Sequence, residues 1–261
     1  MRSTRPPRLQ PSAEALAGLF VAGLLAGCAR PAPQPLTIAA AASLAPVFDG
    51  LAAEVERQFE LTVIFSYGST ANLAEQLRNG APFDVLAAAD AEHVDQLIAE
   101  GLLDRSSRSV FAHGRLVLAW PAGSTIELRS LQDLLDPAVG YVALANPEFA
   151  PYGRAARQAL ELSSLWTELQ PRLIYAESIR DAGQLVASGN AAAGLLAAST
   201  AISLSMPSLV LPAELFDPIE HVAAARTQSE NHQAALEFLA FLHSPQVATA
   251  LEAFGLSPAD G

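Results

Sequence analysis

From Leu36 onward, the chain alternates between short apolar runs and longer segments of helical periodicity, and this alternation constrains its fold more than any other feature. The runs have the length of strands, and the segments between them carry apolar residues three and four apart, as amphipathic helices do. The pattern predicts strands over 36–42, 61–67, 83–89, 114–120, 140–145 and 191–199, and helices over 44–59, 71–79, 91–100, 130–135, 152–161, 178–188 and 231–254. Such alternation is typical of βαβ units and predicts an α/β fold with mostly parallel sheets flanked by helices.

The alternating units form two sets, which the segment "GRLVLAWPAG" separates. We therefore expect the chain to cross between two lobes near 115–121 and to return within 206–226. This division predicts lobe 1 over 36–116, lobe 2 over 117–218, and a C-terminal return to lobe 1 over 219–261. In open α/β sheets a ligand lies beyond the C-terminal ends of the strands, so we expect the site between the lobes.

The first 27 residues have the features of a signal peptide. Three arginines precede an apolar run over 15–27, which is too short to span a bilayer well. The run ends in "LAGC", which resembles a bacterial lipobox, and predicts that Cys28 is lipidated and anchors the mature chain on the periplasmic side of the cell envelope. An ordinary signal peptide followed by an incidental cysteine is the alternative. Residues 28–35 are rich in proline and predict a tether.

The charge of the chain is strongly negative. The formal net charge is −12, and all 15 basic residues are arginines. A nucleic-acid partner would require a basic surface, so this balance argues against one. An anion bound to this chain must be held by local donors, because the field of the whole protein repels it.

Four predicted strand–helix junctions place small polar residues or free amides at the start of a helix. They are "AAASL" with Ser43, "YGSTA" with Ser69 and Thr70, "NPEFAPYG" with Tyr152, and "AESIRD" with Ser178. The unpaired N–H groups and the positive end of the helix dipole make each start a possible anion site. Serine and threonine are also the ordinary N-caps of helices, so each junction taken alone is better explained as a cap.

Five segments occur in an order and spacing that resemble a known family. They are "AAASL", "YGST", "GAPFDVLAAAD", "NPEFAPYG" and "AESIRDAGQLVASGNAAAGLL", and the resemblance runs from about Thr37 to Gly255. The chain resembles the periplasmic molybdate-binding proteins of ABC transporters. The resemblance implies a two-lobed periplasmic binding protein fold of type II, with a tetrahedral molybdate or tungstate ion between the lobes. It further implies a monomer without a cofactor, which delivers the ion to an ABC permease and its ATPase.

The resemblance also implies which residues touch the ion. The contacts are Ser43, Thr70, Tyr152 and Ile179, with Ser69 and the position of Ala197 as possible additions. The two hydroxyls would donate directly and Ile179 would donate through its amide. Some family members carry a further tyrosine donor at the position of Ala197, and here that donor is absent. We expect the Tyr152 hydroxyl to replace it, although the Tyr152 amide alone could also make the contact.

The sequence is also compatible with other functions. The same scaffold could bind sulfate or another oxyanion, or serve as the sensor domain of a signalling receptor. A serine-dependent enzyme would use Ser43 or Ser69 as its nucleophile, but "YGSTA" lacks the second glycine of a nucleophile elbow. The five histidines have no metal-ligand spacing, and we expect them on the surface or on helices, so no base is apparent. Asp84 and Asp90 flank a predicted strand, and we expect them to stabilise local structure.

Overall fold

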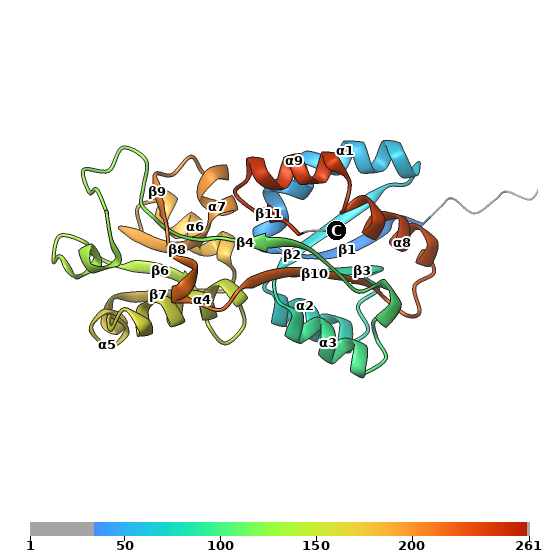
Figure 1. Cartoon of the computed structure of the whole chain (residues 1–261), viewed down its shortest axis with the longest axis horizontal. Coiled ribbons are helices and arrows are strands. Elements are labelled where there is room, and N and C mark those ends of the chain that lie inside the picture. Colours follow the sequence, from blue (N-terminus) through green and yellow to red (C-terminus); the bar gives the residue numbers. More distant parts are fainter. Residues whose placement is uncertain (1–33, 260–261) are drawn as a thin grey trace, which may run out of the picture. The chain divides into compact units, whose positions relative to one another are not determined.

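The computed structural model describes residues 34–259. The predicted signal peptide, Cys28 and most of the tether therefore lie outside the described residues. Two β-sheets with flanking helices make up the described chain (Figure 1). Within this part of the chain, no helix is long and apolar enough to cross a membrane.

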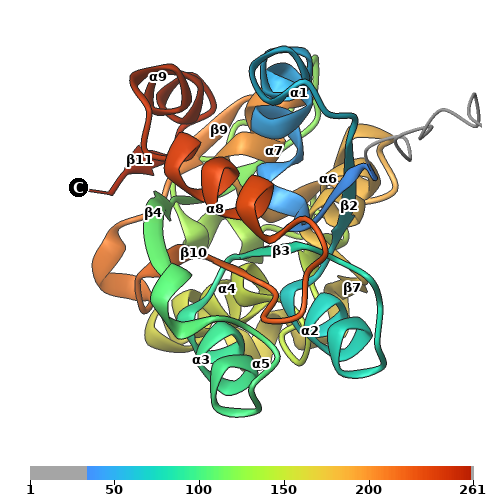
Figure 2. The same ribbon diagram turned by 90° about the vertical axis from the view of Figure 1, so that its right-hand side faces the viewer.

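The first sheet has six strands in the order β11-β4-β10-β3-β1-β2. The strands are β1 (Leu36–Ala41), β2 (Val63–Gly68), β3 (Val85–Ala88), β4 (Ser109–Gly114), β10 (Ile219–Ala225) and β11 (Ser257–Pro258). Helices α2 (Thr70–Arg78) and α3 (Ala91–Ala99) cover one face, and α1 (Ala45–Phe59), α8 (His232–Phe241) and α9 (Pro245–Ala253) lie on the other (Figure 2). Successive side chains of a strand point to opposite faces, so Ala39 packs with α2 and α3 while Ile38 packs with α1.

The second sheet has five strands in the order β7-β6-β8-β5-β9. The strands are β5 (Leu116–Ala119), β6 (Val142–Ala145), β7 (Leu173–Ala176), β8 (Ala193–Ala197) and β9 (Ser208–Val210). Its helices are α4 (Pro151–Leu162), α5 (Trp166–Leu169), α6 (Ile179–Ala187) and α7 (Ala198–Ser203). We call the parts that carry the first and second sheets lobe 1 and lobe 2.

The predicted α/β fold with two lobes is confirmed, but each sheet is mixed. Parallel pairing joins β2-β1-β3 and β7-β6-β8, and the remaining pairs are antiparallel. The antiparallel strands are β4, β5, β9 and β10, which lie next to the crossings between sheets, and β11, which follows α9. Only Arg115 separates β4 in the first sheet from β5 in the second. The strand predicted over 114–120 corresponds to β5, and of its residues only Gly114 belongs to β4.

Three other differences concern single elements. The segment expected as the return crossing, 206–226, contains two strands, β9 and β10. The helix predicted over 231–254 is two helices, because Ser244 caps a new helix that begins at Pro245. The predicted helix over 130–135 is a short 3₁₀ segment, Leu131–Leu135.

Candidate functional site

Five chain segments that follow sheet strands meet at one small pocket. Residues from both lobes line it: Ala41, Ala42, Ser43, Gly68, Ser69, Thr70, Ala89, Ala150, Pro151, Tyr152 and Ile179. The segments follow β1, β2, β3, β6 and β7, whose C-terminal ends therefore lie around the pocket. All four residues predicted as contacts line it, and Ser69 does too. None of the described residues that line this pocket carries a charge.

Ser43 is buried, with 1% of its surface exposed, and its side chain caps no helix. Ser43 lies within a 3₁₀ turn, Ala42–Leu44. Helix α1 begins at Ala45, and its N-cap residue, Leu44, makes no side-chain hydrogen bond. The Oγ atom of Ser43 lies 3.0 Å from Nε2 of His221 instead. Its carbonyl oxygen accepts a hydrogen bond of 2.6 Å from the Ser199 hydroxyl of lobe 2. The cap interpretation of Ser43 is therefore wrong.

Ser69 and Thr70 are both buried at the start of α2. Ser69 occupies the N-cap position but makes no side-chain cap bond, and its Oγ has no hydrogen-bond partner within the described residues. The Thr70 Oγ1 atom accepts a bond of 3.1 Å from the Ala89 amide, which ties α2 to the end of β3. The proton of the Thr70 hydroxyl is thus free to donate. A buried hydroxyl without a partner costs about 1–3 kcal/mol, so the Ser69 hydroxyl is suited to a ligand that accepts hydrogen bonds.

Tyr152 and Ile179 bring two further helix starts to the pocket. Tyr152 is the second residue of α4, after Pro151, and the N-cap Ala150 has no side-chain acceptor. The amides of a helix's first turn have no partner within the helix, so the Tyr152 amide can donate. Burial raises the pKa of the Tyr152 phenol, with the Ser43 hydroxyl acting in the opposite direction, and the phenol therefore stays protonated. Ile179 begins α6 after Ser178, whose side chain accepts from the Asp181 amide.

Two glycines permit the close packing at Tyr152. A Cβ atom on Gly153 would lie 2.3 Å from the carbonyl oxygen of Ala145, so α4 can start this close to the end of β6 only with glycine there. A Cβ atom on Gly114 would lie 2.2 Å from the Tyr152 hydroxyl oxygen and 3.1 Å from Cε1 of His221. Gly114 therefore makes the space that the phenol occupies.

Comparison with known proteins places the chain in a family. The family model described as "Bacterial extracellular solute-binding protein" matches residues 36–257. The chain belongs to this family. Among characterised relatives, the molybdate-binding protein ModA of Azotobacter vinelandii is 34% identical over 238 residues, which cover 90% of this chain and 93% of the relative. ModA of Rhodobacter capsulatus is 31% identical over 241 residues, with 92% and 95% covered.

Solved structures agree with this assignment. The periplasmic molybdate-binding protein of Azotobacter vinelandii superposes with a TM-score of 0.81 at 28% sequence identity, covering 86% of this chain and all of that one. The sulfate-binding protein SubI of Mycobacterium tuberculosis H37Rv superposes with a TM-score of 0.74 at 18% identity, covering 87% and 88%, which shows a shared fold. This member of the solute-binding family therefore has a scaffold that other proteins use for oxyanions.

A histidine that the sequence analysis missed lies beside the predicted contacts. We expected the histidines on the surface or on helices, and for His221 this is wrong: it lies on β10 and is fully buried. Burial lowers the pKa of His221 to about 3, so its ring is neutral at physiological pH. The alternation of Ile219, His221 and Ala223 along β10 was the available signal, because alternate residues of a strand share a face.

Ala197 does not contribute to the pocket. It ends β8, pairs with Leu116 across the second sheet, and is not among the described residues that line the pocket. A side-chain donor is missing at this position, as the sequence indicated. Tyr152, from α4 of lobe 2, lines the pocket together with Ser43.

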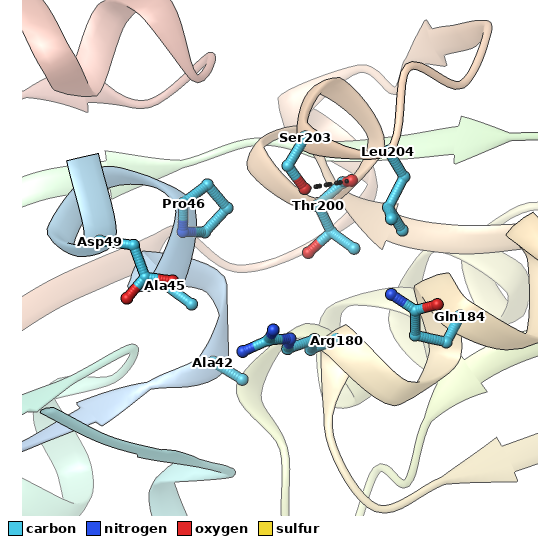
Figure 3. Close-up of a pocket in the computed structure, with 9 residues that line it drawn as sticks. All are labelled: Ala42, Ala45, Pro46, Asp49, Arg180, Gln184, Thr200, Ser203 and Leu204. Atoms are coloured by element: carbon cyan, nitrogen blue, oxygen red, sulfur yellow. Dashed lines mark hydrogen bonds between the residues drawn. The ribbon is translucent and has the colours of Figure 1, made fainter.

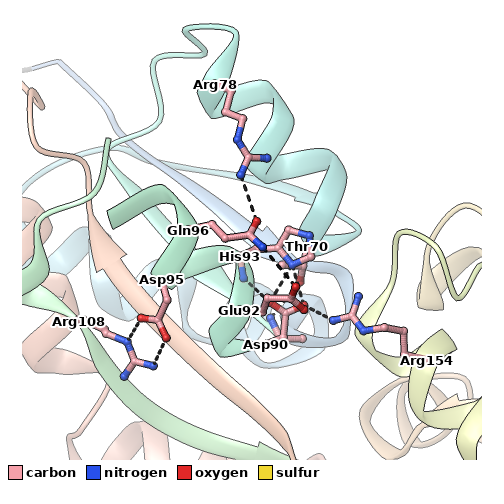
Figure 4. A network of polar contacts seen from close by, with 10 residues as sticks. Thr70, Arg78, Asp90, Glu92, His93, Asp95, Gln96, Arg108 and Arg154 are labelled. Carbon is pink, nitrogen blue, oxygen red and sulfur yellow. Dashed lines mark hydrogen bonds and ion pairs between the residues drawn. The ribbon is translucent and has the colours of Figure 1, made fainter. Parts of the chain in front are cut away.

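Asp84 and Asp90 have structural roles, as expected. Asp84 precedes β3 and accepts hydrogen bonds from the Thr37 amide at 2.8 Å and the Ser229 hydroxyl at 2.6 Å. Asp90 follows β3, caps α3 through the His93 amide, and pairs with Arg154 of lobe 2 at 2.6 Å (Figure 4). Burial alone would raise the pKa of Asp90, but the bonds from His93 and Arg154 outweigh it and hold that pKa below its usual range. The Asp90–Arg154 pair therefore joins the lobes beside the pocket.

A second and larger pocket lies on another side of the 3₁₀ turn that carries Ser43. It has a volume of about 220 Å³, and Arg180 of α6 reaches across it toward Ala42 (Figure 3). Asp49 and Gln184 also line it. It contains none of the predicted contact residues, and its charged groups distinguish it from the uncharged pocket at Ser43.

Proposed function

We propose that this solute-binding protein captures molybdate, and also tungstate, outside the cytoplasm and delivers it to an ABC permease and its ATPase. The observation that carries the proposal is the convergence of Ser43, Thr70, Tyr152 and Ile179, from four segments of two lobes, on one uncharged pocket. Relatives at 34% and 31% identity that are named molybdate-binding proteins support the same ligand. We further propose that the chain acts as a monomer and without a cofactor.

Neutral donors suit a doubly charged oxyanion that must later be released. Each hydroxyl or amide would make a charge-assisted hydrogen bond, and the helix starts add their favourable dipoles. Because no cationic side chain lines the pocket among residues 34–259, affinity depends on having all the donors in place together. Reopening of the lobes would separate the donors of α4 and α6 from those of lobe 1, and the ion would then leave.

Binding requires the lobes or side chains to move. The cavity that the pocket residues enclose is about 10 Å³, which is the room that one water molecule needs. A tetrahedral ion with four oxygens needs more space. We propose that the ion enters with the lobes apart, and that closure brings the donors onto it.

Calorimetry tests this proposal directly. The chain from residue 29 onward, freed of bound ions by dialysis, would be titrated with molybdate, tungstate, sulfate and phosphate. We expect one molybdate per chain, with tungstate bound comparably. Failure to bind either ion would overturn the proposed function.

An enzymatic function is the second candidate, because the structure places a histidine beside a serine. His221 Nε2 lies 3.0 Å from Ser43 Oγ, which is the spacing of a nucleophile and its base. A serine nucleophile needs a base with a pKa near the working pH and a group that orients the base. Burial lowers the pKa of His221 to about 3, and its Nδ1 has no hydrogen-bond partner in the described chain. We propose binding without turnover, and release of nitrophenol from activated esters at a rate that Ser43→Ala abolishes would contradict this.

The anchor is a separate part of the proposal. We propose that Cys28, the only cysteine, is lipidated and holds the protein on the periplasmic side of the envelope. A single acyl chain binds membranes only marginally, whereas a lipoprotein cysteine carries several. Mass spectrometry of the protein extracted from membranes should find a first residue of diacylated Cys28, and Cys28→Ser should release the protein into the soluble fraction. A wild-type protein that is soluble and cleaved at another residue would disprove the anchor.

Removing the Tyr152 hydroxyl should weaken molybdate binding. The phenol is buried at the pocket, and in Tyr152→Phe a charge-assisted donor is lost while the ring still fills its space. We expect the dissociation constant to rise by about ten- to a hundredfold, since such a bond contributes about 1.5–3 kcal/mol. Tyr141→Phe, at an exposed tyrosine, is the matched control and should bind like the wild type. Unchanged affinity in Tyr152→Phe would mean that only the amide of residue 152 makes the contact.

Adding one methyl group at Gly114 should have a comparable effect. In Gly114→Ala the new Cβ would overlap the Tyr152 hydroxyl oxygen, so the phenol must leave its position. We expect about a tenfold or greater loss of molybdate affinity, and a loss of about 1–3 kcal/mol in the free energy of unfolding from overpacking. Gly50→Ala in α1 is the control, because its Cβ would meet nothing within 4 Å. Calorimetry and thermal unfolding measure both effects, and wild-type affinity in Gly114→Ala would show that the phenol's position is unimportant.

A further inference from the structure

His221 is the buried polar side chain at the pocket's edge that the proposed contacts leave unexplained. It is fully buried on β10, and its ring lies between Phe111 and Tyr152, with ring centroids 6.1 Å and 6.2 Å away. Its Nε2 lies 3.0 Å from Ser43 Oγ, and its Nδ1 has no partner within the described residues. An imidazole held in this way can donate to Ser43 or accept from it, and the two cases have opposite consequences for an anion.

The position of one imidazole proton decides what Ser43 offers to the ligand. A serine hydroxyl has one proton and two lone pairs. If Nε2 were unprotonated, Ser43 would donate to it, and the hydroxyl would turn a lone pair toward the pocket. A lone pair repels an anion. If Nε2 carries the proton, it donates to Ser43 Oγ, and the serine proton remains available for the ligand.

The surroundings of the ring favour a proton on Nε2. The ring is neutral and so carries a single N–H, because burial lowers the pKa of His221, with His113 acting in the same direction and Asp90 opposing it. Buried N–H groups without a partner are rarer in proteins than buried acceptors without one. A proton on Nδ1 would be such an unpaired donor, whereas a proton on Nε2 is paired with Ser43.

We propose that His221 is a positioning residue for the ligand: its Nε2–H donates to Ser43 Oγ and thereby directs the only proton of that hydroxyl into the pocket, toward the bound oxyanion. This inference rests on the proposed function for its ligand. It makes β10 part of the binding machinery, although His221 itself does not line the pocket. It also explains why a polar group is buried in a strand whose other inward residues are apolar.

Variants at two positions test the proposal with molybdate as the probe. His221→Phe keeps a planar ring but removes the donor, and we expect its dissociation constant to rise about tenfold or more. His221→Gln restores an N–H₂ group near the position of Nε2, and we expect its dissociation constant within about threefold of the wild-type value. The exposed His243, changed to Gln, is the control and should bind normally.

A double-mutant cycle separates positioning from a general effect on the fold. In a Ser43→Ala background there is no hydroxyl to direct, so His221→Phe should change the affinity by less than about twofold. An equal loss in both backgrounds, or no loss in either, would overturn the proposal. Equal weakening by His221→Gln and His221→Phe would overturn it as well.

The tautomer can be read in the wild-type protein even if a variant fails to fold. Long-range ¹H–¹⁵N correlation spectra of histidine-labelled protein show which ring nitrogen of His221 carries the proton, with and without molybdate. We expect Nε2 in the bound state, and a proton on Nδ1 would overturn the inference. Failure of the wild type to bind molybdate would instead overturn the proposed function, so the two failures are distinguishable.

Discussion

Ser43→Ala and Thr70→Ala should each weaken molybdate binding by about ten- to a hundredfold. Both hydroxyls are buried at the pocket. Each already has one protein partner, the His221 ring for Ser43 and the Ala89 amide for Thr70, and each still has a proton that it can donate to an anion. A hydrogen bond to a charged group contributes about 1.5–3 kcal/mol, which gives the expected change in affinity. Each change also leaves a buried partner unpaired, the His221 ring or the Ala89 amide, so the free energy of unfolding should fall by about 1–3 kcal/mol. Isothermal calorimetry and chemical unfolding measure the two quantities separately.

Two control variants distinguish an effect on molybdate affinity from an effect on the stability of the fold. Thr70→Ser retains the hydroxyl and should bind nearly as well as the wild type. Ser244→Ala removes a true cap, since the Ser244 side chain accepts from the Val247 amide at the start of α9, and it lies outside the pocket. That change should lower stability by about 1 kcal/mol and leave affinity unchanged. If Ser43→Ala and Thr70→Ala behaved like Ser244→Ala, the hydroxyls would have only structural roles.

Much of the pocket could be predicted because it is built from local junctions. Ser43, Thr70, Tyr152 and Ile179 each lie just after a strand whose apolar run is visible in the sequence. Parallel strands of one sheet end at the same edge, so the junctions of one lobe are brought together by the fold itself. The resemblance to molybdate-binding proteins then implies which junctions face each other across the lobes.

The role of each serine could not be decided locally. Ser43 and Ser244 both stand near the start of a helix, and only the tertiary structure shows that Ser244 is a cap and Ser43 is not. The partner of Ser43 lies 178 residues away on β10, a strand that pairs with β3 and β4 across the sheet. Its short run of mainly small apolar residues resembles a crossing segment in sequence, so neither the strand nor the burial of His221 followed from the local pattern.

The second large effect that we expect concerns the choice of anion. Phosphate at neutral pH still carries a proton, and that proton needs an acceptor in the site. The described residues that line the pocket include no carboxylate, and their hydroxyls and amides are needed as donors. A buried donor without a partner costs about 1–3 kcal/mol, so phosphate should bind far more weakly than molybdate. Tight phosphate binding would point to a carboxylate in the closed site. Asp90, which follows the pocket residue Ala89, would be the first to test, because Asp84 lies at the other end of β3.

Sulfate is a stricter test, because it is fully deprotonated and has the same shape and charge as molybdate. Only size separates the two ions: the S–O bonds are shorter than the Mo–O bonds. Donors that two lobes bring to the distance of the larger ion would be stretched around the smaller one, and packed lobes cannot approach further without strain. Several lengthened charge-assisted bonds together should reduce the affinity for sulfate about a thousandfold relative to molybdate. Competition calorimetry, in which sulfate displaces bound molybdate, measures this ratio. Nearly equal affinities would show that the donors adjust to either ion, and that size does not set the specificity of this pocket.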